Sequence, residues 1–384
     1  MKKLLIPLLL SNLIYAQSFV PDAPELNLKS YILIEPNTNT VIAEFNSSSE
    51  IEPASMTKIM TSYVVADQIA NGLISFEDQV LISEKAWRMG GSKMFIEAGK
   101  KVNIADLLKG IIIQSGNDAS VAISEYAGGT ERGFVDLMNA YANSLGMNNT
   151  IFQNSTGLPD ENHFSSAKDL ATLTSNFIIK FPDIYALYKE KQFTFNNIKQ
   201  LNRNKLLWRD ESSDGVKTGH TDAAGYCLVG SAKRGDMRLI TVVAGSDTDN
   251  NRFLASQRLL EYGFRFFATQ KVLNANEEYK SIKIWGGVEQ SLGIGVLEDV
   301  SITLPRTSFK DLTVNYNYSN NIQAPINVGQ TIGTIEIVSN QEVVFSTELV
   351  ALKEIKSKGF FGRLWSKFVL WVYGLFGMTE NGNN

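Results

Sequence analysis

The sequence is poor in the residues that build disulfide frameworks and zinc sites. It has one cysteine, Cys227, and two histidines, His163 and His220, among 384 residues. A single cysteine excludes an intrachain disulfide, so the hydrophobic core must hold the chain together. No cluster of cysteine and histidine occurs at metal-ligand spacing. We therefore expect no metal and no cofactor, and Cys227, in an apolar run, is interpreted as a small buried hydrophobe.

A strong charge imbalance is also missing. The chain carries 36 Lys and Arg against 40 Asp and Glu, a formal net charge of -4, which argues against nucleic acid as the main partner. Hydrophobic residues make up 44% and charged residues 20% of the sequence, which is typical of a globular protein with a sizeable core. The length favours two domains.

The first sixteen residues resemble an export signal rather than a membrane span. Lys2 and Lys3 precede the short apolar run Leu4–Leu10, and Ile14–Ala16 is typical of a cleavage site. The run is too short and wrongly flanked for a membrane span, and the alternative is a buried first strand or helix. We expect residues 1–16 to be a signal peptide and the protein to be exported.

Residues 17–270 are expected to form an α/β (α+β) domain. Apolar runs separated by turn residues predict β-hairpins near both ends, and helical patterns fill the region between them. Strands, then helices, then strands and a last helix predict an antiparallel sheet flanked by helices. The expected helices are Met56–Ala70, Ile104–Ile113, Phe134–Leu145, Ser166 to about Ile179, and Asn251–Phe267.

The pattern changes twice after residue 270. Residues 271–352 contain short alternating runs punctuated by Gly, Asn and Pro, which predict an all-β module. In residues 353–384, aromatic and aliphatic residues recur at three- and four-residue steps among lysines and arginines. This pattern favours an amphipathic helix that anchors the protein to a membrane surface, the alternative being a helix packed on its own β module.

Three short motifs carry the chemistry. S-x-x-K occurs at Ser55–Lys58, S-x-N at Ser115–Asn117 and K-T-G at Lys217–Gly219. Each motif alone arises often by chance, but the three in this order are the set found in serine enzymes that transfer acyl groups from penicillin-like amides. The motifs predict one active site assembled from distant segments.

Ser55 and Lys58 are the expected nucleophile and base. They lie one helical turn apart, so both side chains project from the same face. A serine hydroxyl needs a nearby base, and lysine can serve only if its pKa falls from about 10.4 toward 7. Burial in an apolar helix and a neighbouring cation, for which Lys217 is a candidate, both lower it. Alone, Lys58 would be read as a solvated helix lysine.

The other two motifs supply polar groups for the substrate. Ser115 can relay a proton and the amide of Asn117 can hold a substrate carbonyl, although S-G-N also suits a polar helix stop.

Lys217 and Thr218 offer donors for an anion such as a terminal carboxylate, and Gly219 lets a substrate backbone approach. The backbone N–H groups of Ser55 and His220 are candidates for an oxyanion hole. The His220 side chain can orient residues at the pocket rim or be structural, and the sequence leaves both open.

The chain resembles the D-alanyl-D-alanine carboxypeptidases, the low-molecular-mass penicillin-binding proteins, from about Leu28 to its end. Besides the three motifs, the resemblance includes the extended form Lys217–Tyr226 and the segments Asn154–Leu158 and Gly263–Phe267. It implies a penicillin-binding, β-lactamase-like fold with a β stalk and a location on the periplasmic face of the inner membrane.

The resemblance also implies a reaction. Ser55 attacks the bond between the two terminal D-alanines of a peptidoglycan stem peptide, Lys58 takes its proton, and water hydrolyses the acyl-enzyme. Lys217 and Thr218 hold the free carboxylate, with Arg252 as a second partner, and β-lactams acylate Ser55 as inhibitors.

Three rival interpretations stay open. A β-lactamase shares the motifs, but the class A form adds a glutamate in E-x-x-L-N, and the corresponding stretch Pro159–Phe164 lacks that pattern. A catalytically silent wall-binding scaffold is a second. Transpeptidation, which differs only in the acceptor of the acyl group, is a third.

Overall fold

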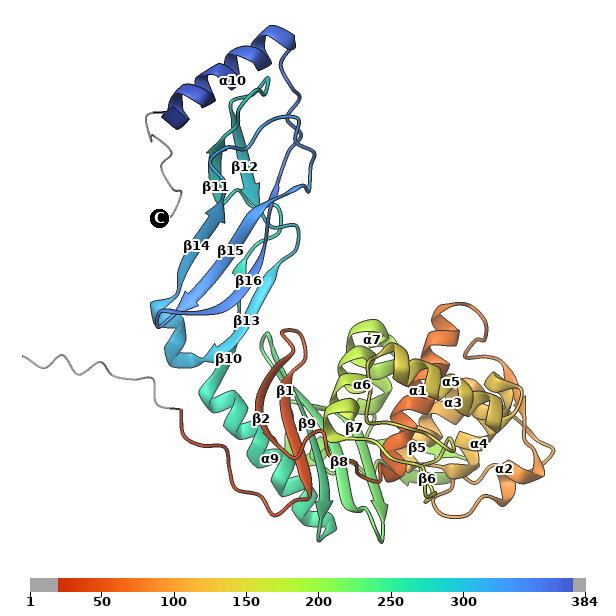
Figure 1. Cartoon of the computed structure of the whole chain (residues 1–384). Helices are drawn as coiled ribbons and strands as arrows, with labels where there is room; N and C mark the ends of the chain where they lie inside the picture. Colours follow the sequence, from red (N-terminus) through yellow and green to blue (C-terminus); the bar gives the residue numbers. More distant parts are fainter. Residues whose placement is uncertain (1–19, 376–384) are drawn as a thin grey trace, which may run out of the picture. The chain divides into compact units, whose positions relative to one another are not determined.

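The computed structural model describes residues 20–375, so the expected signal peptide and residues 376–384 lie outside it. The chain divides into two compact units (Figure 1). The larger unit comprises Ala23–Asn274 and Asp299–Thr303. Of the described residues, the smaller unit comprises Ala275–Glu298 and residues 304–375, together with residues 20–22.

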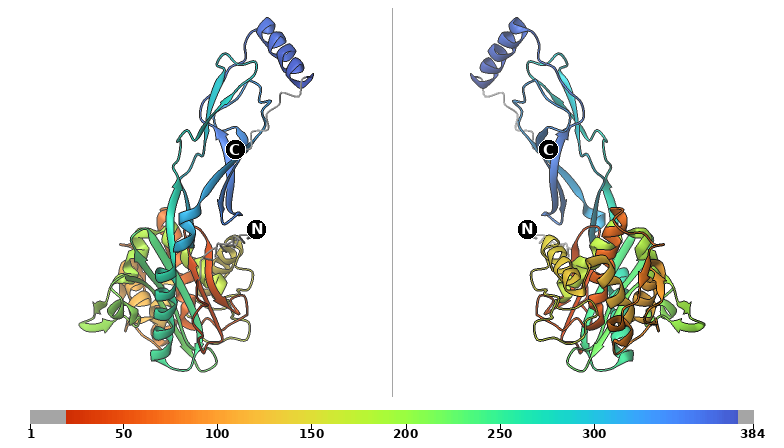
Figure 2. Two further views of the ribbon diagram at one scale, coloured as in Figure 1. Left: turned by 90° about the vertical axis from the view of Figure 1, so that its left-hand side faces the viewer. Right: turned by 90° about the vertical axis from the view of Figure 1, so that its right-hand side faces the viewer.

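The larger unit is built on an antiparallel sheet of five strands within the described residues, in the order β2-β1-β9-β8-β7. Helix α9 (Asp249–Phe266) lies on one face of this sheet, and α1 (Lys58–Ala70) and α6 (Ala167–Lys180) lie on the other (Figures 1 and 2). The strands are β1 (Ser30–Glu35), β2 (Thr40–Phe45), β7 (Ser213–Thr221), β8 (Gly225–Arg234) and β9 (Met237–Ser246).

Two hydrophobic cores form because side chains alternate between the faces of the sheet. Ile32 and Val229 pack in the core that contains α1, whereas Leu33 and Leu228 pack with Phe253 and its neighbours on α9. Helix α1 is buried along most of its length, as its apolar sequence predicts. The sheet that carries the K-T-G motif is therefore held by a hydrophobic core on each of its faces.

Further helices and strands complete the larger unit. The sequence predicts one helix over Ile104–Ile113, but the structure ends an α-helix at Lys109 and continues with a π-helical turn, Gly110–Gln114. A Cβ on Gly110 would lie 2.2 Å from the Met94 sulfur, so the glycine permits close packing there. The elements are β3 (Gln79–Leu81), α2 (Glu84–Arg88), β4 (Lys101–Asn103), α3 (Ile104–Lys109), α4 (Asn117–Gly128), α5 (Glu131–Ser144), α7 (Pro182–Tyr185), β5 (Gln192–Phe195), β6 (Ile198–Leu201), α8 (Leu206–Arg209) and β10 (Phe267–Leu273).

The smaller unit contains an antiparallel sheet in the order β11-β12-β16-β15-β14. Strand β12 is hard to recognise in the sequence, because two of its five residues are glycines and interrupt the side-chain alternation. The predicted fold class, an antiparallel sheet flanked by helices and followed by an all-β module, is confirmed. The strands of this sheet are β11 (Lys280–Lys283), β12 (Ser291–Gly295), β14 (Thr313–Tyr318), β15 (Thr331–Ser339) and β16 (Glu342–Ala351). Strand β13 (Val300–Pro305) pairs with β10 instead, and its residues up to Thr303 belong to the larger unit.

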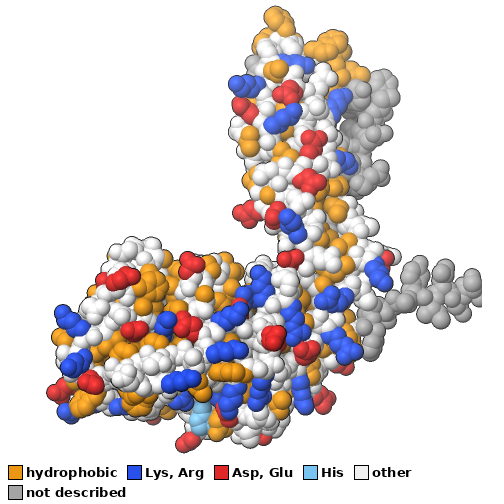
Figure 3. Space-filling model, turned by 180° about the vertical axis from the view of Figure 1, so that it is seen from behind, with side chains coloured by type: hydrophobic (Ala, Val, Ile, Leu, Met, Phe, Trp, Pro, Cys, Tyr) orange, Lys and Arg blue, Asp and Glu red, His pale blue; other side chains and the backbone are white. Residues whose placement is uncertain are grey.

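The C-terminal helix α10 spans Phe360–Leu375 and begins later than residue 353. The preceding residues still belong to the β module, because Ile355 bridges to Ile326 and is buried. Hydrophobic side chains form an orange group at the top of Figure 3. On α10, the aromatic side chains of Phe361 and Trp365 are 83% and 68% exposed. Among the helices of residues 20–375, none has the length and apolarity needed to cross a membrane.

Candidate active site

Ser55 and Lys58 lie where a 3₁₀-helical turn, Ala54–Thr57, leads into α1. The Lys58 Nζ atom lies 3.0 Å from the Ser55 Oγ atom. The Lys58 side chain is completely buried. The first motif thus places a candidate base within hydrogen-bonding distance of a candidate nucleophile.

Two further contacts set the direction of the Lys58 amine. Its Nζ donates to Asn117 Oδ1 at 2.7 Å and to the Thr156 carbonyl oxygen at 2.6 Å. Asn117 Nδ2 donates to the Gly90 carbonyl at 2.8 Å, which fixes the amide orientation. A neutral amine has two N–H groups and one lone pair. Both hydrogens are therefore taken by acceptors, and the lone pair faces the Ser55 hydroxyl.

The surroundings of Lys58 favour this neutral form. Burial is the largest cause that lowers the pKa of Lys58, and the positive charge of Arg203 lowers it further. The Asp118 carboxylate acts in the opposite direction, and the net result is a pKa of about 7. A large fraction of the amine is then unprotonated at neutral pH.

Ser115 and Lys217 bring the second and third motifs together. Ser115 ends the π-helical turn in a left-handed conformation, with φ of 65°. The Lys217 Nζ atom donates to Ser115 Oγ at 2.9 Å and to the Thr218 carbonyl at 3.1 Å. Burial, followed by the charges of Lys58, Arg203 and Arg252, holds the pKa of Lys217 well below its ordinary value.

Strand β7 forms one wall of a cavity of about 380 Å³. The His220 ring is exposed and stacks on the Tyr226 ring, with centroids 4.1 Å apart. The cavity is lined by Ser55, Ser92, Ser115, Arg203, Lys205, Thr218, Gly219, His220, Asp249 and Arg252. Six of the nine residues predicted for the site line this cavity. The other three do not line it but contact residues that do: Lys58 contacts Ser55, Lys217 contacts Ser115, and Asn117 contacts Ser92.

Gly219 packs closely against the turn that carries the nucleophile. A Cβ at this position would lie 3.0 Å from the Pro53 carbonyl oxygen and 3.2 Å from the Ala54 Cβ. The absence of a side chain therefore lets β7 approach the Ala54–Thr57 turn. This requirement is separate from the approach of substrate that the sequence suggested.

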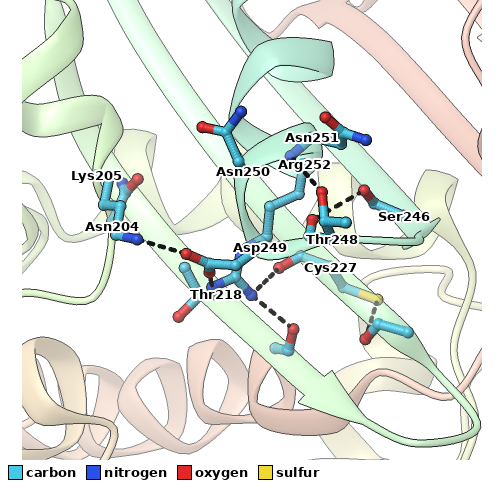
Figure 4. Close-up of polar contacts among 12 residues, drawn as sticks. Asn204, Lys205, Thr218, Cys227, Ser246, Thr248, Asp249, Asn250, Asn251 and Arg252 are labelled. Atoms are coloured by element: carbon cyan, nitrogen blue, oxygen red, sulfur yellow. Dashed lines mark hydrogen bonds and ion pairs between the residues drawn. The ribbon is translucent and has the colours of Figure 1, made fainter.

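Arg252 reaches from α9 toward β7 and β8 (Figure 4). Its Nη1 atom donates to the Gly219 carbonyl at 3.0 Å and to the Cys227 carbonyl at 3.3 Å, and its Nη2 atom pairs with Asp249. The Nε atom is buried and has no partner among the described residues. The guanidinium thus fixes the backbone of both strands beside the cavity, and it also places a positive charge at the cavity.

Sequence reasoning missed Arg203, which follows β6 in a loop. Its Nε donates to the Gln114 carbonyl at 2.9 Å, next to Ser115, and its charge lowers the pKa of both Lys58 and Lys217. No local pattern marks this arginine, because its position depends on how the loop folds back over the end of the π-helical turn.

Asp118 was also missed, although it follows the second motif directly. Its buried carboxylate accepts the backbone N–H groups of Met94 at 2.8 Å, Phe95 at 2.9 Å and Ile96 at 3.3 Å. These bonds fix the segment that runs beside Asn117. Within residues 20–375, no group of three or more His, Cys, Asp or Glu side chains is arranged to hold a metal ion.

Comparisons with known proteins identify the family of the chain. A model of the D-alanyl-D-alanine carboxypeptidases matches residues 17–248, and a model of the penicillin-binding protein 5 C-terminal domain matches residues 267–357. The chain is 42% identical to the D-alanyl-D-alanine carboxypeptidase DacA of Escherichia coli K12 over 369 residues, 94% of this chain and 92% of that protein. Identity to DacC of the same organism is 40% over 371 residues, 94% and 93% of the two chains.

The fold has a similar relative among solved structures. Penicillin-binding protein 5 from Haemophilus influenzae superposes with a TM-score of 0.84 at 38% sequence identity. The match covers 88% of this chain and all of that chain.

Proposed function

Because this chain belongs to the D-alanyl-D-alanine carboxypeptidase family of serine peptidases, we propose that it removes the terminal D-alanine from peptidoglycan stem peptides through an acyl-Ser55 intermediate. The observation that carries the residue assignment is the 3.0 Å contact between Lys58 Nζ and Ser55 Oγ, made by an amine that also has Asn117 Oδ1 and the Thr156 carbonyl within hydrogen-bonding distance. β-Lactams acylate the same serine.

Acylation begins with proton transfer from Ser55 to Lys58. The serine oxygen attacks the carbonyl carbon of the penultimate D-alanine, and the backbone N–H groups of Ser55 and His220 stabilise the oxyanion. Collapse of the tetrahedral intermediate breaks the peptide bond. The proton that Lys58 took from Ser55 is relayed through Ser115 to the departing nitrogen, so D-alanine leaves as a free amine. Water then attacks the acyl-enzyme and releases the shortened peptide.

Positive charge selects a substrate with a free C-terminal carboxylate. Lys217, Thr218 and Arg252 are the proposed partners of that carboxylate, while Asn117 and Gly219 contact the peptide backbone. Burial lowers the pKa of Lys217 in the free protein, and an incoming anion favours its charged form again. Arg203 also lines the cavity, and its positive charge strengthens the preference for an anion.

The positions of the acidic residues support slow hydrolysis of a β-lactam from Ser55. The acidic residues nearest in sequence to the missing E-x-x-L-N glutamate are Asp160 and Glu161, and they line a different cavity with Glu50 and Glu52. Asp249 does line the Ser55 cavity, but it is paired with Lys205 and Arg252. A paired carboxylate is a poor base for activating deacylating water.

We expect labelled penicillin to stay attached through denaturing electrophoresis, with the adduct on the peptide that contains Ser55. The same preparation should release D-alanine from a diacetyl-Lys-D-Ala-D-Ala peptide. Rapid loss of label with hydrolysed penicillin would instead indicate a β-lactamase. A labelled protein that releases no D-alanine would indicate a scaffold, and transfer to an added amine would indicate transpeptidation.

We further propose that the protein acts on the periplasmic face of the inner membrane and that α10 lies at the lipid surface. The support is an exposed run of large apolar side chains on one helix, each more than half exposed. Such a helix gains free energy by burying these groups at the headgroup boundary. The apolar members with this exposure are Phe360, Phe361, Leu364, Trp365, Phe368 and Trp371.

Deleting residues from Gly359 onward should give an active enzyme that no longer sediments with membranes. The cut spares Ile355, which is buried in the β module. Full-length protein carrying Trp365→Glu and Phe368→Glu is the matched variant, since it retains the chain but places charge on the apolar face. Sedimentation of either variant with anionic vesicles to the extent of the wild type would contradict the anchor.

A further inference from the structure

One peptide group holds Lys58 in its productive direction. The carbonyl oxygen of Thr156 lies 2.6 Å from Lys58 Nζ. The nitrogen of the same peptide group belongs to Gly157, and its N–H donates to Asn154 Oδ1 at 2.8 Å. A single planar unit therefore joins the candidate base to the side chain of Asn154.

The planarity of the peptide bond makes these two contacts interdependent. In a trans peptide the C=O and N–H groups point in opposite directions and rotate together. Fixing the Gly157 N–H on Asn154 therefore fixes the direction of the Thr156 carbonyl. Rotation of this plane would remove one of the two acceptors of Lys58, and the amine lone pair would no longer be held toward Ser55.

Asn154 is well placed for this role because its side chain closes a turn on its own backbone. Its Oδ1 atom also accepts from the Thr156 N–H at 3.1 Å and the Thr156 hydroxyl at 2.8 Å. Its Nδ2 atom donates to the Leu158 carbonyl at 3.0 Å. Four contacts from one amide thus define the turn over residues 154–158.

The rest of the turn is anchored to neighbouring helices. Thr61 on α1 donates to the Ser155 carbonyl at 2.7 Å, and the Ser155 hydroxyl donates to Glu131 at 3.0 Å. Gly157 has φ of 78°, and a Cβ there would lie 1.8 Å from the Ala54 carbonyl oxygen. The turn is therefore seated directly against the residue that precedes the nucleophile.

We propose that Asn154 is a positioning residue for acylation, which aims the Lys58 lone pair at Ser55 by holding the Thr156–Gly157 peptide plane. This inference rests on the proposed function. Asn154 is half-buried and does not line the Ser55 cavity, so it acts on the base and leaves substrate binding unchanged.

The decisive experiment measures acylation by a fluorescent penicillin in stopped flow, with the acylation rate constant separated from the non-covalent dissociation constant. Asn154→Ala should lower the rate constant roughly thirtyfold, since a misplaced catalytic group of this kind costs one to two orders of magnitude. The dissociation constant should stay within about twofold. Asn103→Ala is the matched control, because Asn103 makes a comparable bond to the Asp106 N–H at the start of α3.

Asn154→Asp tests the positioning role through the pH profile of the acylation rate constant, which a purely structural role would leave unchanged. The carboxylate keeps the acceptor for the Gly157 N–H, but its charge raises the pKa of Lys58. The rate constant should therefore return to within about threefold of the wild type at pH 9 while the acid side of its pH profile moves upward. This variant also decides the matter if Asn154→Ala fails to fold.

Failure of this inference is distinguishable from failure of the proposed function. A wild-type protein that penicillin does not acylate refutes the function. A wild type that is acylated, alongside a folded Asn154→Ala variant that reacts at least half as fast, refutes only the positioning role. An Asn154→Asp variant that stays slow at pH 9 with an unmoved pH profile refutes it equally.

Discussion

Ser55→Ala is expected to abolish both D-alanine release and covalent capture of penicillin. The variant removes the protein atom that bonds to the acyl group in the proposed mechanism, so no acyl-enzyme can form. Loss of a serine nucleophile typically costs several orders of magnitude in kcat. Mass spectrometry of the intact protein after exposure to penicillin should show no added mass, and D-alanine release should fall to background.

The fold should survive this substitution. Ser55 is partly exposed to the cavity, and its hydroxyl contacts only Lys58 among the described residues. Ser62→Ala, a buried serine on the same helix, is the control, because it removes a hydroxyl from α1 outside the cavity. If Ser55→Ala melted normally and still carried a penicillin adduct, another nucleophile would have to be sought.

The sequence predicts the fold class and most of the site because both are encoded locally. Apolar periodicity marks α1, and three short motifs mark Ser55, Ser115 and Lys217. Lys217 and Ser115 are 102 positions apart and in contact, and the motif set predicts only that both belong to one site. The roles assigned to these residues stay predictions until variants are measured.

The parts that sequence reasoning missed have a common physical reason. The Thr156 contact uses a backbone carbonyl, which every residue has and no sequence pattern marks. Arg203 acts through its charge, and only the folded loop brings that charge near two lysines. Gly219 is visible in its motif, but its close packing against Ala54 requires the three-dimensional arrangement.

The second large effect concerns the charge state of Lys58. The unprotonated amine is the active form, so kcat/KM should rise with pH and level off above the pKa of Lys58. The midpoint of the rise should lie near 7, because burial and the charge of Arg203 lower that pKa to about 7. A lysine with an ordinary pKa of about 10.4 would be unprotonated in only about four of ten thousand molecules at pH 7. Lys58→Met, which has no base, should lose a factor of about 10² to 10⁴ in kcat/KM at pH 8.

Arg203→Gln tests the cause of this midpoint. Removing the positive charge raises the pKa of Lys58, because the protonated amine no longer meets a repulsive neighbour, so the rise in kcat/KM should move to higher pH. The acylation rate constant measured at saturating penicillin should move in parallel, and because it does not depend on binding it separates this effect from any loss of carboxylate binding. Lys180→Met, at the exposed end of α6, should leave the profile unchanged. A flat profile from pH 6 to 9 in the wild type would show that Lys58 is not the titrating base.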